Sequence, residues 1–140
     1  MHYKFCDSSV IKDTGTAKGR GVFATRLILA GETIEICPVV LVNADWEEMP
    51  KQVQRIVFDW GRLTKGPCAS CIALGWGSIY NHGNPANIRY SAEKDGLSMV
   101  FTAARDIALG EELTINYNET AGDIHSSEDV WFQDTGITPI

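Results

Sequence analysis

The amino-acid sequence predicts a mainly β domain that carries one short helical insert. Two observations support this fold class. Most apolar segments are short and lie between Gly, Asn and Asp turn signals, which is typical of strands. Residues 43–63 differ, because their apolar side chains recur at three- and four-residue spacing and define one face of a helix. A chain of 140 residues is expected to form one domain that folds without disulfides.

The region before the insert predicts four short strands. Residues 10–11 begin the first strand, and residues 21–25 form the second. Residues 33–37 alternate apolar and polar side chains, as a half-buried strand does. Pro38 is expected to break this strand, so that residues 39–42 form a separate apolar strand.

The helical insert extends from Asn43 to about Leu63. Asp45 and Glu48 have the spacing of a capping box, which would begin a first helical turn. Pro50 would end that turn and begin a second helix, because its missing N–H costs nothing at the first helical position. The apolar face of the second helix would consist of Val53, Ile56, Val57 and Trp60.

The region after the insert predicts further strands and a tail. Glycines interrupt the apolar run from Ile72 to Tyr80, which indicates a bend or a close approach of the backbone. Asp95-Gly96 predicts a hairpin turn that leads into a strand at residues 97–103. A later turn leads into a strand at residues 113–117, and residues 118–140 form a mostly polar tail.

The net charge of −6 and the pI of about 4.9 argue against the basic face of a nucleic-acid-binding protein. An acidic surface attracts a basic polypeptide, although the same acidity is common in proteins that need only solubility. No apolar run is long enough to span a membrane, and no secretory signal is apparent in residues 1–7. These observations predict an intracellular protein without a direct nucleic-acid or membrane partner.

The four cysteines do not predict a metal site. Cys68 and Cys71 have the spacing of half a zinc site. The other half is missing, because Cys6 and Cys37 lie far apart in the sequence and His125 stands alone. We therefore expect reduced thiols that are buried or partly buried, and no bound metal.

Two short segments could contact a ligand. Gly19-x-Gly21 follows a turn, and glycines let backbone N–H groups approach a carboxylate or a phosphate closely. A tight turn explains the same glycines, and Lys18 and Arg20 beside them could pair with an anion or lie in solvent. Asn81-His82 ends an apolar run, where two polar side chains cost stability unless a ligand or the protein satisfies them.

Three segments, in this order, resemble the motifs of SET domains in protein-lysine methyltransferases. Residues 18–24 (KGRGVFA) resemble the opening cofactor motif. Residues 79–82 (IYNH) with Asn87 resemble the Asn-His-Ser-x-x-Pro-Asn motif, although Gly83 replaces its serine and Pro85 displaces its proline. Residues 104–117 (ARDIALGEELTINY) are similar to the closing motif. The short chain looks most like the minimal bacterial and viral members.

The resemblance implies a β-clip of small sheets with a pseudoknotted C-terminal segment. The whole chain, residues 1–140, would be a single SET domain with its core at about residues 8–118. Residues 119–140 would form a tail over the cofactor, because the family's C-terminal zinc motif is absent. Trp131-Phe132 would either cover the cofactor or dock the tail onto the core.

The resemblance also implies the site residues and the cofactor, S-adenosylmethionine. Tyr117 would be the catalytic residue, since its hydroxyl would place the substrate amine and stabilise developing charge. The implied cofactor-binding residues are Lys18, Gly19, Arg20, Gly21, Asn81, His82, Tyr117 and Trp131. The implied lysine channel is lined by Tyr80, Tyr90 and Ile115. At the position of Ile115 other members use Phe or Tyr to help set the number of methyl groups added.

The implied function is methyl transfer to a lysine of a basic protein or peptide. A histone, a histone-like DNA-binding protein or a ribosomal protein would suit the acidic surface. The protein would be cytoplasmic in a bacterium, whereas a viral or eukaryotic member could be nuclear. Small members can pair as homodimers. Two alternatives stay open: a non-catalytic module that binds cofactor or a basic peptide, and a purely structural β-clip.

Overall fold

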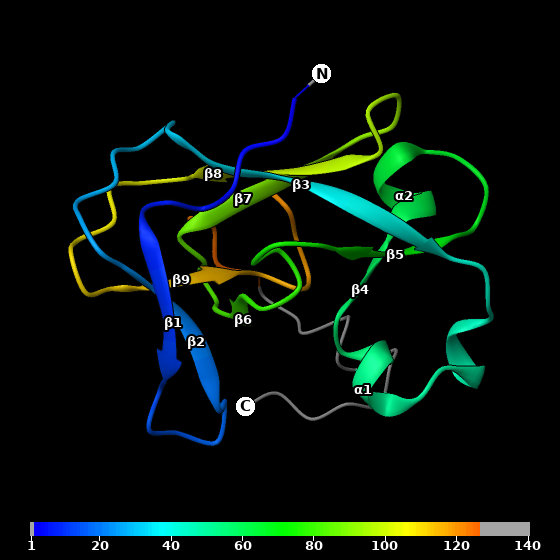
Figure 1. Cartoon of the computed structure of the whole chain (residues 1–140), viewed down its shortest axis with the longest axis horizontal. Coiled ribbons are helices and arrows are strands. Elements are labelled where there is room, and N and C mark those ends of the chain that lie inside the picture. Colours follow the sequence, from blue (N-terminus) through cyan, green and yellow to red (C-terminus); the bar gives the residue numbers. More distant parts are fainter. Residues whose placement is uncertain (1, 127–140) are drawn as a thin grey trace.

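Nine short strands make two sheets in residues 2–126, the part of the chain that the computed structural model describes (Figure 1). The mainly β fold class is therefore confirmed. The four-stranded sheet has the order β1-β2-β9-β6 and contains β1 (Ser9–Asp13), β2 (Arg20–Ala24), β6 (Asn81–His82) and β9 (Glu112–Ile115). The five-stranded sheet has the order β4-β5-β3-β8-β7 and contains β3 (Thr33–Val42), β4 (Val57–Asp59), β5 (Ser70–Ala73), β7 (Ile88–Glu93) and β8 (Ser98–Ala103).

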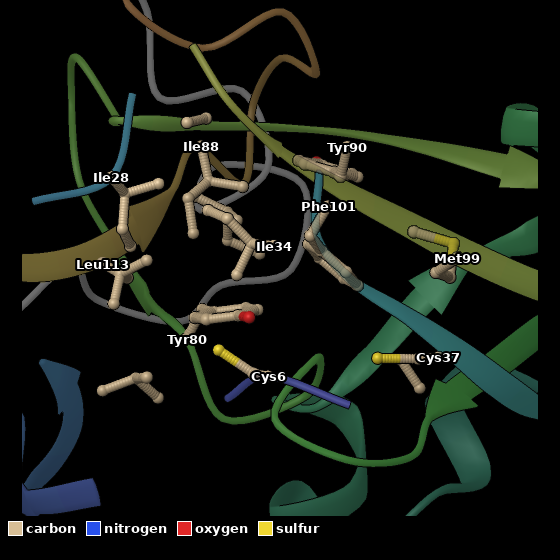
Figure 2. Close-up of a cluster of buried hydrophobic side chains, with 14 of the residues drawn as sticks. Cys6, Ile28, Ile34, Cys37, Tyr80, Ile88, Tyr90, Met99, Phe101 and Leu113 are labelled. Carbon is tan, nitrogen blue, oxygen red and sulfur yellow. The ribbon is translucent and has the colours of Figure 1, made fainter. Parts of the chain in front are cut away.

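Both sheets contribute to one apolar core (Figure 2). Val22 of β2 and Leu113 of β9 are fully buried, as are Ile34 of β3 and Phe101 of β8. Removing such side chains from water is the main force that holds the sheets together. The core therefore fixes how the small sheet sits against the larger one, and with it the relative positions of the three motif segments.

Strand β9 lies between β2 and β6, which come from distant parts of the chain. It pairs antiparallel with β2, where Leu113 faces Val22. It pairs parallel with β6, where Thr114 faces Asn81 and Ile115 faces His82. The opening, middle and closing motifs thus lie on neighbouring strands, although none of them is adjacent in sequence.

Strand β3 continues through Pro38, so the predicted break at this residue is wrong. Residues 33–38 pair with β8, whereas residues 39–42 pair with β5. Pro38 lies where the strand changes from one partner to the other, and Val39 supplies the next N–H to the carbonyl of Leu97. No ladder bond requires an N–H from Pro38, so the proline is tolerated inside a long strand.

The insert is less helical than the sequence predicts. Its helices are the 3-10 helix η1 (Trp46–Glu48), α1 (Lys51–Gln54) and α2 (Trp60–Thr64). The predicted second helix is interrupted because residues 57–59 form β4 and pair with β5. An apolar run with β-branched and aromatic side chains suits an edge strand, and pairing with β5 overrides the helical spacing.

The helix caps of the insert also differ from the prediction. Asp45 makes no side-chain capping bond, so the predicted capping box with Glu48 is wrong. Pro50 precedes α1 as its N-cap residue instead of occupying the first helical position. Asp59, which the sequence did not single out, caps α2 by accepting a hydrogen bond from the N–H of Arg62 at 3.1 Å.

Candidate functional site

Asn81 joins the opening loop to the closing strand. Its Nδ2 donates to the carbonyl of Arg20 at 2.9 Å and to Oε2 of Glu112 at 2.8 Å. Lys18 makes a parallel link, because its Nζ donates to the carbonyl of His82 at 3.0 Å. The predicted cofactor residues of the loop and of β6 are therefore held together by hydrogen bonds between segments that lie far apart in sequence.

The two glycines of the loop meet different physical demands. Gly19 has a φ of 76°, which is the left-handed region that glycine adopts without cost. Gly21 is closely packed, since a Cβ there would lie 2.5 Å from Oε2 of Glu112 and 2.9 Å from Cγ2 of Thr14, and both side chains would have to move. A tight turn thus explains Gly19, and close packing explains Gly21. No other atom lies within 4 Å of the position that a Cβ on Gly19 would take.

His82 orients the residue predicted to be catalytic. The backbone N–H of Tyr117 donates to Nδ1 of His82 at 3.1 Å, and the two rings have centroids 5.1 Å apart. An Nδ1 that accepts a hydrogen bond leaves the hydrogen of the neutral imidazole on Nε2. His82 therefore has a structural task as well as its predicted place beside the cofactor.

Tyr117 carries a hydroxyl that is fixed and neutral. The hydroxyl donates to the carbonyl of Tyr80 at 3.3 Å. Burial and, to a smaller extent, the negative charge of Glu112 together raise the pKa of Tyr117 to about 12. Tyr117 can therefore donate and accept hydrogen bonds at neutral pH, but it is not a general base there.

A cavity of about 540 Å³ lies in front of Tyr117. Its lining includes Tyr80, Tyr90, Ile115 and Tyr117, so the structure brings the predicted channel residues and the predicted catalytic residue together. Lys18, Asn81 and His82 are not among the lining residues. His82 connects the two regions, because it contacts Tyr117, which lines the cavity, and its carbonyl accepts a hydrogen bond from Lys18 of the loop.

Tyr80 and Tyr90, the two tyrosines predicted to line the channel, also donate hydrogen bonds from their hydroxyls to groups of the protein. Tyr90 donates to the carbonyl of Asn116 at 3.1 Å, and burial raises the pKa of Tyr90 well above its ordinary value. Tyr80 donates to Oε1 of Glu35 at 2.6 Å, so its hydroxyl points into the core while the residue borders the cavity. The hydroxyls are thus oriented before any substrate enters.

The insert supplies the opposite wall of the cavity, which the sequence did not assign to the site. Phe58 of β4 packs edge-on against Tyr90, with ring centroids 5.6 Å apart. The insert residues that line the cavity are Trp46, Glu47, Arg55, Ile56, Val57, Phe58, Asp59, Arg62 and Leu63, and Cys68, Ala69 and Ser70 after the insert line it too. Only their position in the fold reveals this wall, since no local pattern separates them from ordinary surface and core residues.

No group of three or more His, Cys, Asp or Glu side chains in residues 2–126 is arranged to hold a metal ion. Cys71 is fully buried, whereas Cys68 is exposed and lies at the cavity. Within the same described part of the chain, no helix is long and apolar enough to cross a membrane.

Comparison with known proteins identifies the family. A model of the SET domain matches residues 19–118. The histone-lysine N-methyltransferase of Schizosaccharomyces pombe that is specific for lysine 37 of histone H3 is 31% identical over 127 residues, which cover 89% of this chain and 76% of that protein. The chain belongs to the SET domain family of protein-lysine methyltransferases.

A solved structure has a similar fold. A Plasmodium falciparum protein assigned as a histone methyltransferase superposes with a TM-score of 0.61 and 25% identity. The superposition covers 84% of this chain and 95% of that one. Both of these similar proteins are eukaryotic, and the expected closeness to minimal bacterial and viral members stays a prediction.

One departure from the SET middle motif, Gly83 in place of serine, has a structural cause. A Cβ on Gly83 would lie 2.6 Å from Oγ1 and 2.8 Å from Cβ of Thr114, so this chain has no room for the motif's serine. Asn87 keeps its place in the motif. Its Oδ1 accepts the N–H of Thr114 at 2.8 Å, and its Nδ2 donates to the carbonyl of Glu112 at 2.7 Å.

The described part of the SET tail reaches the cavity. The carbonyl of Thr120 accepts the N–H of Tyr90 at 3.0 Å, and Asn118, Glu119 and Thr120 line the cavity. Trp131, which we predict to contact the cofactor, lies outside the described residues.

Proposed function

We propose that this SET protein transfers methyl groups from S-adenosylmethionine to the side-chain amine of a lysine in a basic protein. The observation that carries the proposal is the position of Tyr117. This residue borders the cavity on one side and contacts His82, next to the predicted cofactor loop, on the other. A site for methyl transfer needs this arrangement, because two reactants must meet from separate entrances.

The residues around the loop fit the amino-acid end of the cofactor. Lys18 brings an ammonium group that can pair with a carboxylate. The open space beside Gly19 leaves its backbone accessible, whereas Gly21 packs closely and holds the loop in place. When bound, S-adenosylmethionine supplies a methyl group on a positively charged sulfur. Asn81 and His82 hold the loop and Tyr117 around that position through the hydrogen bonds described above.

The cavity can prepare the substrate amine without a general base. At pH 7.4 a lysine with the usual pKa must lose a proton at a cost of about 4 kcal/mol. An apolar channel lowers this cost, because burial disfavours the charged amine. Tyr80, Tyr90 and Ile115 provide such surroundings. The hydroxyl oxygen of Tyr117 can accept an N–H of the amine while its hydrogen goes to the carbonyl of Tyr80, which aims the nitrogen lone pair.

A histone is the substrate that we favour. The net charge of −6 draws basic proteins toward the molecule, and the acidic residues Glu47, Asp59 and Glu119 of the cavity lining outnumber the basic residues Arg55 and Arg62. The similar Schizosaccharomyces pombe enzyme is named for a lysine of histone H3. A histone substrate would place the protein in a nucleus, whereas histone-like or ribosomal substrates would fit a bacterial cytoplasm.

The test combines transfer and binding. The purified protein is incubated with isotopically labelled S-adenosylmethionine and, separately, with histones, a histone-like protein and ribosomal proteins. Mass spectrometry then locates the modified lysine and counts the methyl groups. We expect transfer to one of these proteins and a loss of transfer in Tyr117→Phe. Tyr3→Phe is the matched control, because Tyr3 is exposed and neither Tyr3 nor its hydrogen-bond partner Gly96 lines the cavity.

Calorimetry with the cofactor separates the alternatives. Cofactor binding without transfer to any basic protein would favour a binding module in place of an enzyme. The absence of both would leave only a structural role for the fold.

A further inference from the structure

We propose that Glu35 is a positioning residue for Tyr117 and that it acts through Tyr80. The inference rests on the proposed role of Tyr117 in methyl transfer. Glu35 lies on β3 in the five-stranded sheet, and it does not touch the cavity. Nothing in the SET motifs of this chain assigns a task to it.

The carboxyl group of Glu35 is buried and fully engaged. Only 1% of the residue is exposed. Its Oε1 accepts the hydroxyl of Tyr80 at 2.6 Å, and its Oε2 accepts the backbone N–H of Trp76 at 3.3 Å. Burial raises the pKa of Glu35, while its hydrogen bonds with Tyr80 and Cys37 oppose this rise.

The loop after β5 is shaped around this carboxyl group. Gly75 has a φ of 77°, and a Cβ there would lie 3.0 Å from Oε2 of Glu35. A buried carboxyl group costs free energy, and an apolar side chain of similar size would avoid that cost. The cost suggests that orientation of a partner, and not stability alone, accounts for Glu35.

Tyr80 connects Glu35 to the site through its two ends. Its phenol is held by Glu35, and its ring packs against Phe101 with centroids 5.1 Å apart. Figure 2 shows the hydroxyl of Tyr80 on the side of Cys6 and Cys37, inside the core. Its backbone carbonyl is the acceptor for the hydroxyl of Tyr117. Fixing the side chain of Tyr80 therefore limits how that carbonyl can rotate, and with it the direction of the Tyr117 hydroxyl.

The kinetic test compares three variants. Tyr80→Phe removes the hydroxyl, Glu35→Ala removes the acceptor, and Glu35→Gln retains a side-chain oxygen that can accept. We expect Tyr80→Phe and Glu35→Ala to lower kcat about tenfold, because small displacements of a positioning group reduce turnover strongly. KM for the peptide and Kd for S-adenosylmethionine should stay within about twofold. Glu35→Gln should recover most of the turnover, and Glu32→Gln, at an exposed ion pair with Arg26, is the matched control.

A spectroscopic test addresses the geometry directly. The chain has four tyrosines, so fluorine NMR of fluorotyrosine-labelled protein gives few signals, and Tyr117→Phe assigns that of Tyr117. We expect Tyr80→Phe and Glu35→Ala to shift the Tyr117 signal and to leave the Tyr3 signal in place. Glu35→Gln keeps an oxygen that can accept the hydroxyl of Tyr80, so we expect a smaller shift of the Tyr117 signal in this variant. This variant also keeps the test available if Glu35→Ala does not fold.

The outcomes separate the two proposals. A Tyr117 signal and a kcat that are both unchanged in Tyr80→Phe would overturn the role of Glu35, even if the variant is less stable. If the wild-type protein transfers no methyl group, the proposed function fails. The fluorine spectra then still decide whether Glu35 positions Tyr117.

Discussion

The two walls of the cavity are built in different ways. On the wall of Tyr80, Tyr90 and Tyr117, every hydroxyl bonds to a group from a distant segment. On the insert wall, the side-chain hydrogen bonds of α2 are local, as in the cap that Asp59 makes and in the bond from Thr64 Oγ1 to the carbonyl of Trp60, whereas the backbone of β4 pairs with β5. The first wall therefore depends on side-chain bonds between distant segments, whereas side chains of the second can vary while the pairing of β4 with β5 holds its backbone. We expect chemistry to be sensitive to changes in the first wall and substrate choice to changes in the second.

The largest effect should follow from Tyr117→Phe. The change removes one hydroxyl from the tyrosine wall and leaves its ring in place. We expect kcat to fall about 10² to 10³-fold, as when one donor is removed from a charge-stabilising site. Steady-state methylation assays measure this loss, and calorimetry should show that cofactor binding is largely kept. A variant that retains full turnover would remove the catalytic role of this hydroxyl and break the comparison.

The second effect concerns the packing that supports the tyrosine wall. Gly83→Ser places a Cβ against Thr114, and such overpacking costs about 1–3 kcal/mol of the free energy of unfolding. Urea denaturation measures the loss. Thr114→Ala removes Oγ1 and Cγ2 from the contact, so the double variant should lose less than the sum of the single ones. Additive losses would show that the two positions are independent.

The third effect is on the insert wall and on substrate binding. Asp59→Asn removes a negative charge at the cavity but keeps an oxygen that can cap α2. We expect KM for a basic peptide to rise about twofold to fivefold, as for other exposed charges, and kcat to stay the same. The rise should shrink at high salt, because salt screens charges at the surface. A fall in kcat would instead place Asp59 with the catalytic wall.

The smallest effect is expected on the pH dependence of the rate, because Tyr117 does not ionise below pH 10. Its pKa lies at about 12, above the ordinary value of 10.0, so the hydroxyl stays neutral over this range. The methylation rate should rise from pH 7 to pH 10 as the substrate lysine loses its proton. The wild type and Tyr117→Phe should show this rise alike, and a decline seen in the wild type alone would contradict the neutral hydroxyl.

The same raised pKa affects stability at high pH. The neutral hydroxyl of Tyr117 stabilises the fold below pH 10, and this contribution is lost as the pH rises through about 12. Thermal unfolding between pH 9 and pH 12 should therefore show a steeper loss in the wild type than in Tyr117→Phe. Equal slopes for the two proteins would contradict the raised pKa.

The parts of the fold that depend on local pattern could be predicted from the sequence. Short strands, the hairpin at Asp95-Gly96 and the closing strand follow from turn residues and alternation, and the structure has them, although the closing strand ends at Ile115 and not at Tyr117. The insert and Pro38 were misjudged because both depend on which strand lies alongside. Residues 57–59 become a strand only because β5 is there to pair with them, and Pro38 is tolerated only where β3 changes partner.

The sequence by itself determined the family, because the order and spacing of the three motifs do not require a structure. It also pointed to Tyr117, through the resemblance of the closing segment. Only the tertiary structure decided that β9 lies between β2 and β6, that Thr114 occupies the space beside Gly83, and that Glu35 accepts a hydrogen bond from Tyr80. The physical reason is that local patterns report which side of an element is apolar, whereas hydrogen bonds and packing between distant segments depend on which elements become neighbours.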